Sequence, residues 1–154
     1  MLRKLYIIVL GFALFGGFSV AEAGELVLRV DTDGLTTFDA HAAASGGGAA
    51  FYVSGDICAD TTLLMACVPI GTFHCWGWLI GPNQLAAVVT QEYAIDGRGK
   101  IQVQGIEDGG PRAVTGGTGD FRNVRGEATG FDLSDLFAGG EFIATFKLIG
   151  AKGG

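Results

Sequence analysis

A histidine, a cysteine and two tryptophans lie close together in one short apolar run of the chain. If this run is a β-strand, its side chains alternate, so that His74, Trp76 and Trp78 share one face and Cys75 lies on the other. His74 and Cys75 then cannot bind the same metal ion. His41 is the only other histidine, which leaves too few nitrogen ligands for a zinc site. We therefore expect no metal centre.

The face that carries Trp76 and Trp78 has two interpretations. It is either an outward surface covered by another subunit or a loop, or an aromatic lining for a flat, apolar ligand, as in many small-molecule sites. Tyr93, inside another strand-like run, is a second aromatic candidate for ligand contact.

Glu92 is a carboxylate in the middle of a strand-like run, whereas most other acidic residues fall in turns. A glutamate at such a position usually lies on the solvated face. If its face instead points into the protein, the loss of water around it would suit Glu92 to act as a general acid or base.

Common enzyme motifs are missing from the sequence. It contains no GxSxG nucleophile elbow, and its three cysteines and two histidines suggest no nucleophile–base pair by their spacing. Its glycine-rich stretch lacks the GK[ST] of a phosphate-binding loop. These absences argue against the common hydrolase and nucleotide-binding classes.

The glycine-rich stretch, residues 113–128, reads AVTGGTGDFRNVRGEA and lies between two strand-like runs. Gly116, Gly117 and Gly119 permit positive φ or close approach of the backbone, as a sharp exit from a strand requires. Phe121 can fold its ring back over the end of a barrel or over its core. From these residues alone, the main role of the stretch is to turn a corner.

The same stretch resembles the signature of dirigent proteins and the related allene oxide cyclases, in which a strand ends in GGTG or GGSG. A turn with an aromatic residue follows, as at Phe121 here, and the next strand opens with Ala-Arg-Gly where this chain has Val124-Arg125-Gly126. The resemblance covers roughly residues 88–128 well and the amino-terminal half only loosely. It implies a barrel with Asp120 and Arg125 flanking the mouth of a cavity, and Phe121 beside the ligand.

Short apolar runs separated by glycine predict an all-β chain. We expect eight strands, at residues 25–30, 49–57, 71–80, 84–95, 98–106, 111–115, 126–133 and 141–149. A further short strand near 36–42 and single helical turns at 120–124 and 134–137 are also expected. Eight hairpin-linked strands suit a closed barrel, with a sandwich as the alternative, and the resemblance favours a single eight-stranded antiparallel β-barrel.

The first 23 residues resemble a signal peptide, with Arg3 and Lys4 before an apolar run and Ala21-Glu22-Ala23 as the cleavage pattern. The apolar run is too short for a comfortable membrane span, which needs roughly 20 residues. Removal of this segment would leave one domain, 24–154, with a formal charge of −7. That charge argues against nucleic acid or an anionic membrane as a partner. We expect a secreted protein, either periplasmic or extracellular.

Three cysteines follow the predicted leader, and an oxidising compartment would permit one disulfide. Cys58 ends one strand-like run and Cys67 precedes the next, so the two face each other across one loop. We predict a Cys58–Cys67 disulfide with Cys75 free and buried.

Three functions are compatible with these features. The resemblance implies a cofactor-free barrel that directs cyclisation or stereoselective coupling of a small apolar intermediate. The alternatives are a binding barrel without catalysis and a structural or surface oligomer. The resemblance also implies a homo-oligomer, either a trimer or a dimer, and no cofactor.

Overall fold

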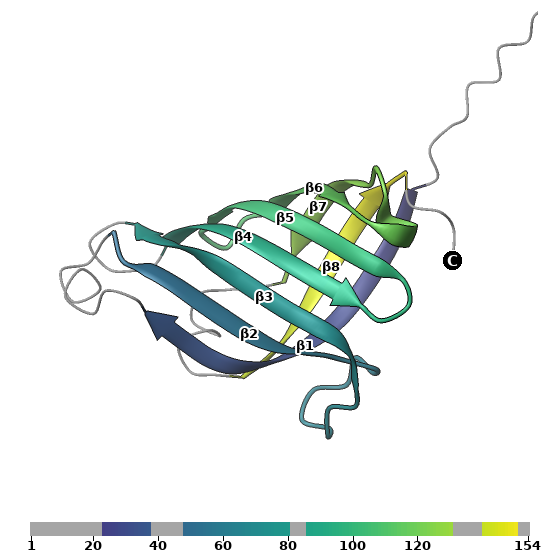
Figure 1. Cartoon of the computed structure of the whole chain (residues 1–154), viewed down its shortest axis with the longest axis horizontal. Coiled ribbons are helices and arrows are strands. Elements are labelled where there is room, and N and C mark those ends of the chain that lie inside the picture. The colour runs from purple at the N-terminus through teal and green to yellow at the C-terminus, as the bar shows by residue number, and fades with distance from the viewer. Residues whose placement is uncertain (1–22, 38–47, 81–85, 131–139, 151–154) are drawn as a thin grey trace, which may run out of the picture.

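Alternating apolar residues form the strands of this protein, as the sequence indicates, and the strands wrap into a barrel (Figure 1). The computed structural model describes residues 23–37, 48–80, 86–130 and 140–150. A single 3₁₀ turn, η1 (Gly119–Phe121), separates β6 from β7. The strands are β1 (Ala23–Thr37), β2 (Ala50–Cys58), β3 (Pro69–Ile80), β4 (Ala86–Ile95), β5 (Gly99–Glu107), β6 (Arg112–Gly117), β7 (Arg125–Thr129) and β8 (Glu141–Ile149).

Every strand pairs antiparallel with its neighbour in the sequence, and β8 pairs with β1 to close the sheet. Closure leaves no unpaired edge strand, which is the usual liability of an open sheet. The predicted all-β, single eight-stranded antiparallel barrel is confirmed. No helix among the residues that the structure describes is long and apolar enough to cross a membrane.

The boundaries differ from the prediction at two places. β1 is one continuous strand, whereas the sequence suggested a strand ending at Val30 and a second one near 36–42. Its register with β2 shifts between Thr32 and Leu35, beside Gly34 with a φ of 91°. The bulge keeps the chain in the sheet across a polar segment. β7 ends at Thr129, and the predicted helical turn at 134–137 lies outside the described residues.

Inward-facing side chains form one apolar core along the barrel. Large residues face glycines on the neighbouring strand, as at Phe51 opposite Gly77 and Phe73 opposite Gly55. This large-to-small pairing lets aromatic rings fill a narrow interior without overpacking.

The glycine-rich stretch turns the corner between β6 and β7, as expected, and its glycines meet the two expected needs at different positions. A positive φ of 60° occurs at Gly119, whereas Gly117 is required for close approach. A Cβ at Gly117 would lie 2.7 Å from the carbonyl oxygen of Phe121 and closer still to that of Lys100. A larger residue at Gly117 would therefore collide with backbone rather than strain its own torsion angles.

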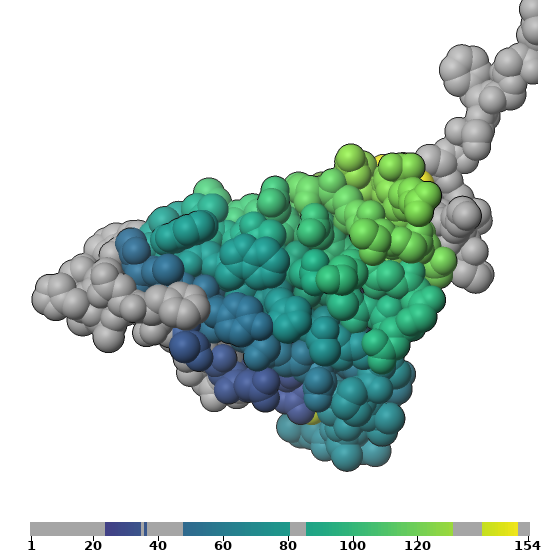
Figure 2. Space-filling model, viewed as in Figure 1, coloured from purple at the N-terminus to yellow at the C-terminus, as the bar shows by residue number. Residues whose placement is uncertain are grey.

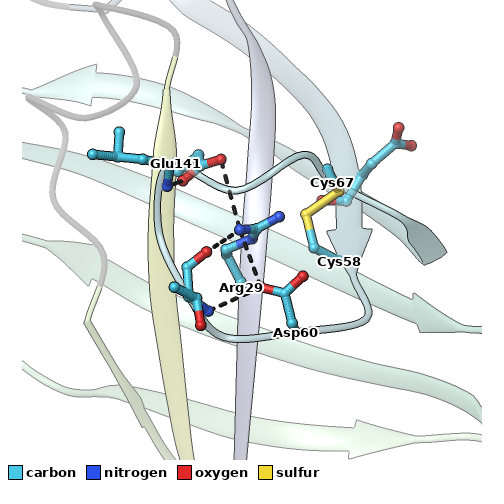
Figure 3. The surroundings of a disulfide bond; sticks show 8 residues. Arg29, Cys58, Asp60, Cys67 and Glu141 are labelled. Atoms are coloured by element: carbon cyan, nitrogen blue, oxygen red, sulfur yellow. Dashed lines mark hydrogen bonds and ion pairs between the residues drawn. A yellow bond between two sulfur atoms is a disulfide. The ribbon is translucent and has the colours of Figure 1, made fainter.

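The predicted Cys58–Cys67 disulfide is present, and Cys75 is free and buried. The disulfide closes the loop between β2 and β3, which lies against the outer face of β1 (Figure 3). There the loop covers Arg29, which is 0% exposed and forms an ion pair with Asp60 at 3.2 Å and a longer one with Glu141 at 3.9 Å. The Arg29 guanidinium also donates a hydrogen bond to the Thr62 carbonyl.

Candidate functional site

Side chains alternate between the inner and outer faces along β4, and this alternation decides which polar side chains enter the barrel. Val89, Gln91 and Tyr93 alternate with outward residues and are buried, so Gln91 and Tyr93 lie in the interior. Two further polar side chains join them where β5 ends and β6 begins. These are Glu107 and Arg112, both buried.

The four side chains form a connected polar chain inside the barrel. The Tyr93 hydroxyl donates to Gln91 Oε1 at 3.2 Å, and Gln91 Nε2 donates to Glu107 Oε1 at 2.5 Å. Arg112 Nη1 lies 3.6 Å from the same Glu107 oxygen. Gln91 therefore links a phenol to a buried carboxylate–guanidinium pair.

Burial also keeps protons on the two weak acids at this site. It raises the pKa of the Tyr93 hydroxyl far above its ordinary value, with Arg112 opposing that effect. Burial, reinforced by the nearby Glu107 carboxylate, raises the pKa of the Cys75 thiol well above its ordinary value. Near neutral pH, Tyr93 is a hydrogen-bond donor and Cys75 is an unreactive thiol.

The polar chain borders a cluster of four aromatic rings. Tyr93 belongs to both, since its ring packs 4.9 Å from those of Phe73 and Phe146, measured between centroids. Phe142 completes the cluster through an edge contact with Phe73. Along β4, away from its turn with β5, the inward side chains shrink from Tyr93 to Ala87. In the β4–β5 register Glu107 lies opposite Ala87, so the ion pair is at the end of β4 with small inward side chains, whereas Tyr93 lies opposite Ile101, nearer the turn between the two strands.

Three of the predicted site residues lie on the outer face. Glu92 forms a 2.8 Å ion pair with Lys100 across β4 and β5, so the condition for an interior acid or base is not met there. Trp76 and Trp78 also point outward, and Trp78 is 55% exposed. The alternation of β3 was predicted correctly, and it places the two tryptophans outside rather than in a cavity lining.

The residues implied by the resemblance lie at the η1 end of the barrel. Asp120 pairs with Arg98 at 3.4 Å, and Arg125 donates to the carbonyl of Val124, so the structure does not bring Asp120 and Arg125 together as a pair. Phe121 is buried, with the Arg98 guanidinium 5.1 Å from its ring centroid. The roles assigned to these three residues remain predictions.

Sequence reasoning missed Gln91, Glu107 and Arg112. A signal existed for Glu107, because the alternation of the inward Ile101 and Val103 continues to Glu107 if the strand is extended by one residue. No comparable signal identified Arg112, which opens a short strand after a turn. Among the described residues, no group of three or more His, Cys, Asp or Glu side chains could hold a metal ion.

Comparison with protein families and with curated proteins finds no match. Solved structures do match. A pyocyanin demethylase superposes with a TM-score of 0.62 at 19% identity, covering 81% of this chain and 99% of that one. A pterocarpan synthase dirigent protein gives 0.66 at 14% identity, covering 98% of both chains. A second one gives 0.62 at 13% identity, covering 89% of this chain and all of the other. The chain therefore has the dirigent-like barrel fold that the glycine-rich stretch predicted.

Proposed function

We propose that this protein binds one small apolar molecule inside its barrel and directs a cofactor-free cyclisation or stereoselective coupling of a reactive intermediate there. One observation carries the proposal, namely the buried chain from Tyr93 through Gln91 to Glu107 and Arg112 in a largely apolar interior. A carrier that binds by apolar contact alone has no need of a buried ion pair, which is costly to desolvate. Each of the three solved structures named above also bears a name that describes chemistry on a small organic molecule.

The arrangement suits control by orientation. Polar groups in a water-poor interior act more strongly on a ligand than they would in water, because there is little solvent to screen them. Tyr93 would exchange its hydrogen bond to Gln91 for one to the ligand, because a phenol has a single proton to donate, and Glu107 would accept a proton or stabilise developing positive charge. The aromatic cluster would restrict the poses of a bound intermediate, so that one product geometry is favoured.

Native mass spectrometry of the protein purified from its own host tests the proposal. We expect a co-purified small molecule on the wild type that is lost from Glu107→Gln and reduced in Tyr93→Phe. Glu92→Gln is the matched control, because it makes the same chemical change on the outer face. Retention of the molecule by Glu107→Gln, or an equal loss in Glu92→Gln, would overturn the interior assignment. Loss in Asp120→Asn at an unchanged melting temperature would support the predicted role of Asp120 at the cavity mouth.

We also propose self-association, as a trimer or dimer, through the outward face of β3 to β5. Trp76, Trp78, Val88 and Ile106 are large apolar side chains exposed on this face. Trp78 pairs with Val88 and Val88 with Ile106 across the strands, so three of the four adjoin directly. Contiguous exposed apolar surface of this kind usually marks an interaction site. Sedimentation showing a monomer at tens of micromolar would overturn this proposal.

An exported location is part of the same proposal. The Cys58–Cys67 disulfide supports it, because disulfides persist in oxidising compartments and are rare in the cytosol. The predicted leader, residues 1–23, falls outside the described residues except for Ala23. Fractionation of the host and the mass of the mature amino terminus would test both the location and the cleavage site.

A further inference from the structure

The loop closed by Cys58–Cys67 presents an apolar tip to solvent. Leu63, Leu64, Met65 and Val68 are all exposed, and Leu64 reaches 96% exposure. The loop, which joins the end of β2 to the start of β3, projects from the barrel (Figure 2). Leucine is rarely left so exposed beside other apolar side chains without a binding partner. We call Leu63, Leu64 and Met65 the loop tip, and Val68 lies at the base of the loop, where its carbonyl accepts a hydrogen bond from Ala59.

The loop tip is held rigidly from beneath. The buried Arg29 binds the loop through Asp60 and the Thr62 carbonyl, and the Leu64 amide donates to Glu141 Oε2 at 2.6 Å. Leu64 has a φ of 67°, a conformation that a non-glycine residue adopts at some energetic cost. An apolar side chain displayed on a strained, braced backbone is preorganised for docking.

A second exposed apolar surface lies on the same chain, the outer-face patch of Trp76, Trp78, Val88 and Ile106. The loop tip is held against β1 and β8 through Arg29 and Glu141, and the nearest patch residue, Trp76, lies eight residues beyond Val68 along β3, which is roughly 26 Å of extended chain. The loop tip therefore cannot cover the patch of its own chain, but it can reach that of another copy.

The acidic residues around the loop favour docking of a loop tip on the outer-face patch over docking of two loop tips on each other. Asp31 pairs directly with both Asp56 and Glu141 on neighbouring strands, and Asp60 lies in the loop itself. The one cation among these carboxylates, Arg29, is buried. Two loop tips would bring like charges together, whereas the four patch residues carry no charge.

We propose that the loop tip of one copy docks on the outer-face patch of a second copy, with Leu64 and Met65 packing against Trp76 and Trp78. This inference rests on the self-association proposed above and names the two surfaces that meet. Such a contact between unlike surfaces forms a ring when its rotation closes, or a two-fold dimer when it occurs twice.

Sedimentation of the full chain and of single-surface variants tests the proposal. We expect Leu64→Asp with Met65→Asp, and separately Trp78→Asp, each to raise the dissociation constant at least tenfold. An equimolar mixture of the two variants should form a mixed complex, because one contributes an intact patch and the other an intact loop tip. Thr61→Asp in the loop and Thr72→Asp on β3 are matched controls at exposed positions, and both should associate like the wild type.

Leu64→Gly separates lost docking from misfolding, because glycine accepts the positive φ while removing the side chain. It should weaken association, and at concentrations low enough for both proteins to be monomeric it should melt at the same temperature as the wild type. If the wild type sediments as a monomer, both this inference and the proposed self-association are wrong. An oligomer that survives the loop variants, with no rescue on mixing, overturns this inference alone and assigns the interface to patch-on-patch contact. Small-molecule binding in the barrel is expected to be unchanged throughout.

Discussion

Two fully buried arginines are paired with carboxylates in this protein, one on each side of the sheet. Arg29 lies outside the barrel beneath the disulfide loop, and Asp60, its nearer partner, is 43% exposed. Arg112 lies inside, and its partner Glu107 is linked through Gln91 to the Tyr93 hydroxyl. The first pair joins a loop to a strand, whereas the second belongs to a chain of proton donors and acceptors.

The difference shows that the groups in contact with a buried ion pair determine whether the pair serves stability or ligand chemistry. Arg29 binds groups of the loop that covers it, so its ion pair and hydrogen bond stabilise the position of that loop. The Glu107–Arg112 pair, on β5 and β6, instead contacts the interior side chain of Gln91 on β4. We expect Arg29 to matter mainly for stability and the Glu107–Arg112 pair mainly for ligand chemistry.

Arg29→Met should give the largest loss of stability. It removes the cation from between Asp60 and Glu141, and breaking a buried pair on one side costs about 3–5 kcal/mol. Because Asp60 is half exposed, we expect the lower end of that range in urea unfolding. Arg98→Met, at the exposed pair with Asp120, is the control and should cost less than about 1 kcal/mol. A loss below 1 kcal/mol for Arg29→Met would contradict the bracing role.

Removing the disulfide should give the next largest effect. Cys58→Ala with Cys67→Ala opens a short loop and should cost about 2–3 kcal/mol in the chain-entropy model. Combined with Arg29→Met, the loss should be smaller than the sum of the two, because both changes release the same loop. Strict additivity in a double-mutant cycle would show that the disulfide and Arg29 act independently.

Stability should fall with pH above about 8.5, the ordinary pKa of a cysteine thiol. Burial and Glu107 raise the pKa of Cys75, so at alkaline pH the folded chain keeps a proton that the unfolded chain has lost. Between pH 8.5 and about pH 10, the ordinary pKa of tyrosine, each pH unit then removes about 1.4 kcal/mol, and above that range the buried Tyr93 hydroxyl adds a second loss of the same kind. Cys75→Ala should flatten this part of the profile. An unchanged slope in Cys75→Ala would mean that other groups cause the decline.

The smallest change in stability is expected from replacing the whole interior pair. Glu107→Gln together with Arg112→Met removes both charges, and such replacements are often close to neutral, within about 1 kcal/mol here. Small-molecule binding should nevertheless be lost. A collapse of stability as large as that of Arg29→Met would show that the interior pair is structural as well.

Much of the fold could be predicted because it depends on local sequence signals. Alternation set the two faces of β3 correctly, and the loop between two strand-like runs identified Cys58 and Cys67 as a pair. The site was harder to predict. Gln91 and Glu92 are adjacent, and only the direction in which the sheet curls decides which of them enters the barrel. Alternation indicates that they face opposite ways, but not which way is inward.

Arg29 and Arg112 show more clearly what the alternation of residues along a strand cannot predict. Alternation places Arg29 outside, next to Leu28 and Val30 in the core, and so predicts exposure. Its burial depends on a loop more than 30 residues later in the chain folding back over it. Arg112 meets Glu107 because a short turn brings the end of β5 to the start of β6. Both arginines are therefore buried by tertiary contacts that local periodicity does not contain.

The closing contact between β1 and β8 has a consequence for how the molecule is assembled. Seven of the eight strand pairings join neighbours in the sequence and can form as successive hairpins. The eighth joins Ala23–Asp31 to Glu141–Ile149, so its loop spans nearly the whole domain. Contacts of such long sequence separation are slow to form, because the entropy of loop closure must be overcome first. We therefore expect the barrel to close only after β8 has been synthesised, however early the hairpins from β1 to β7 form.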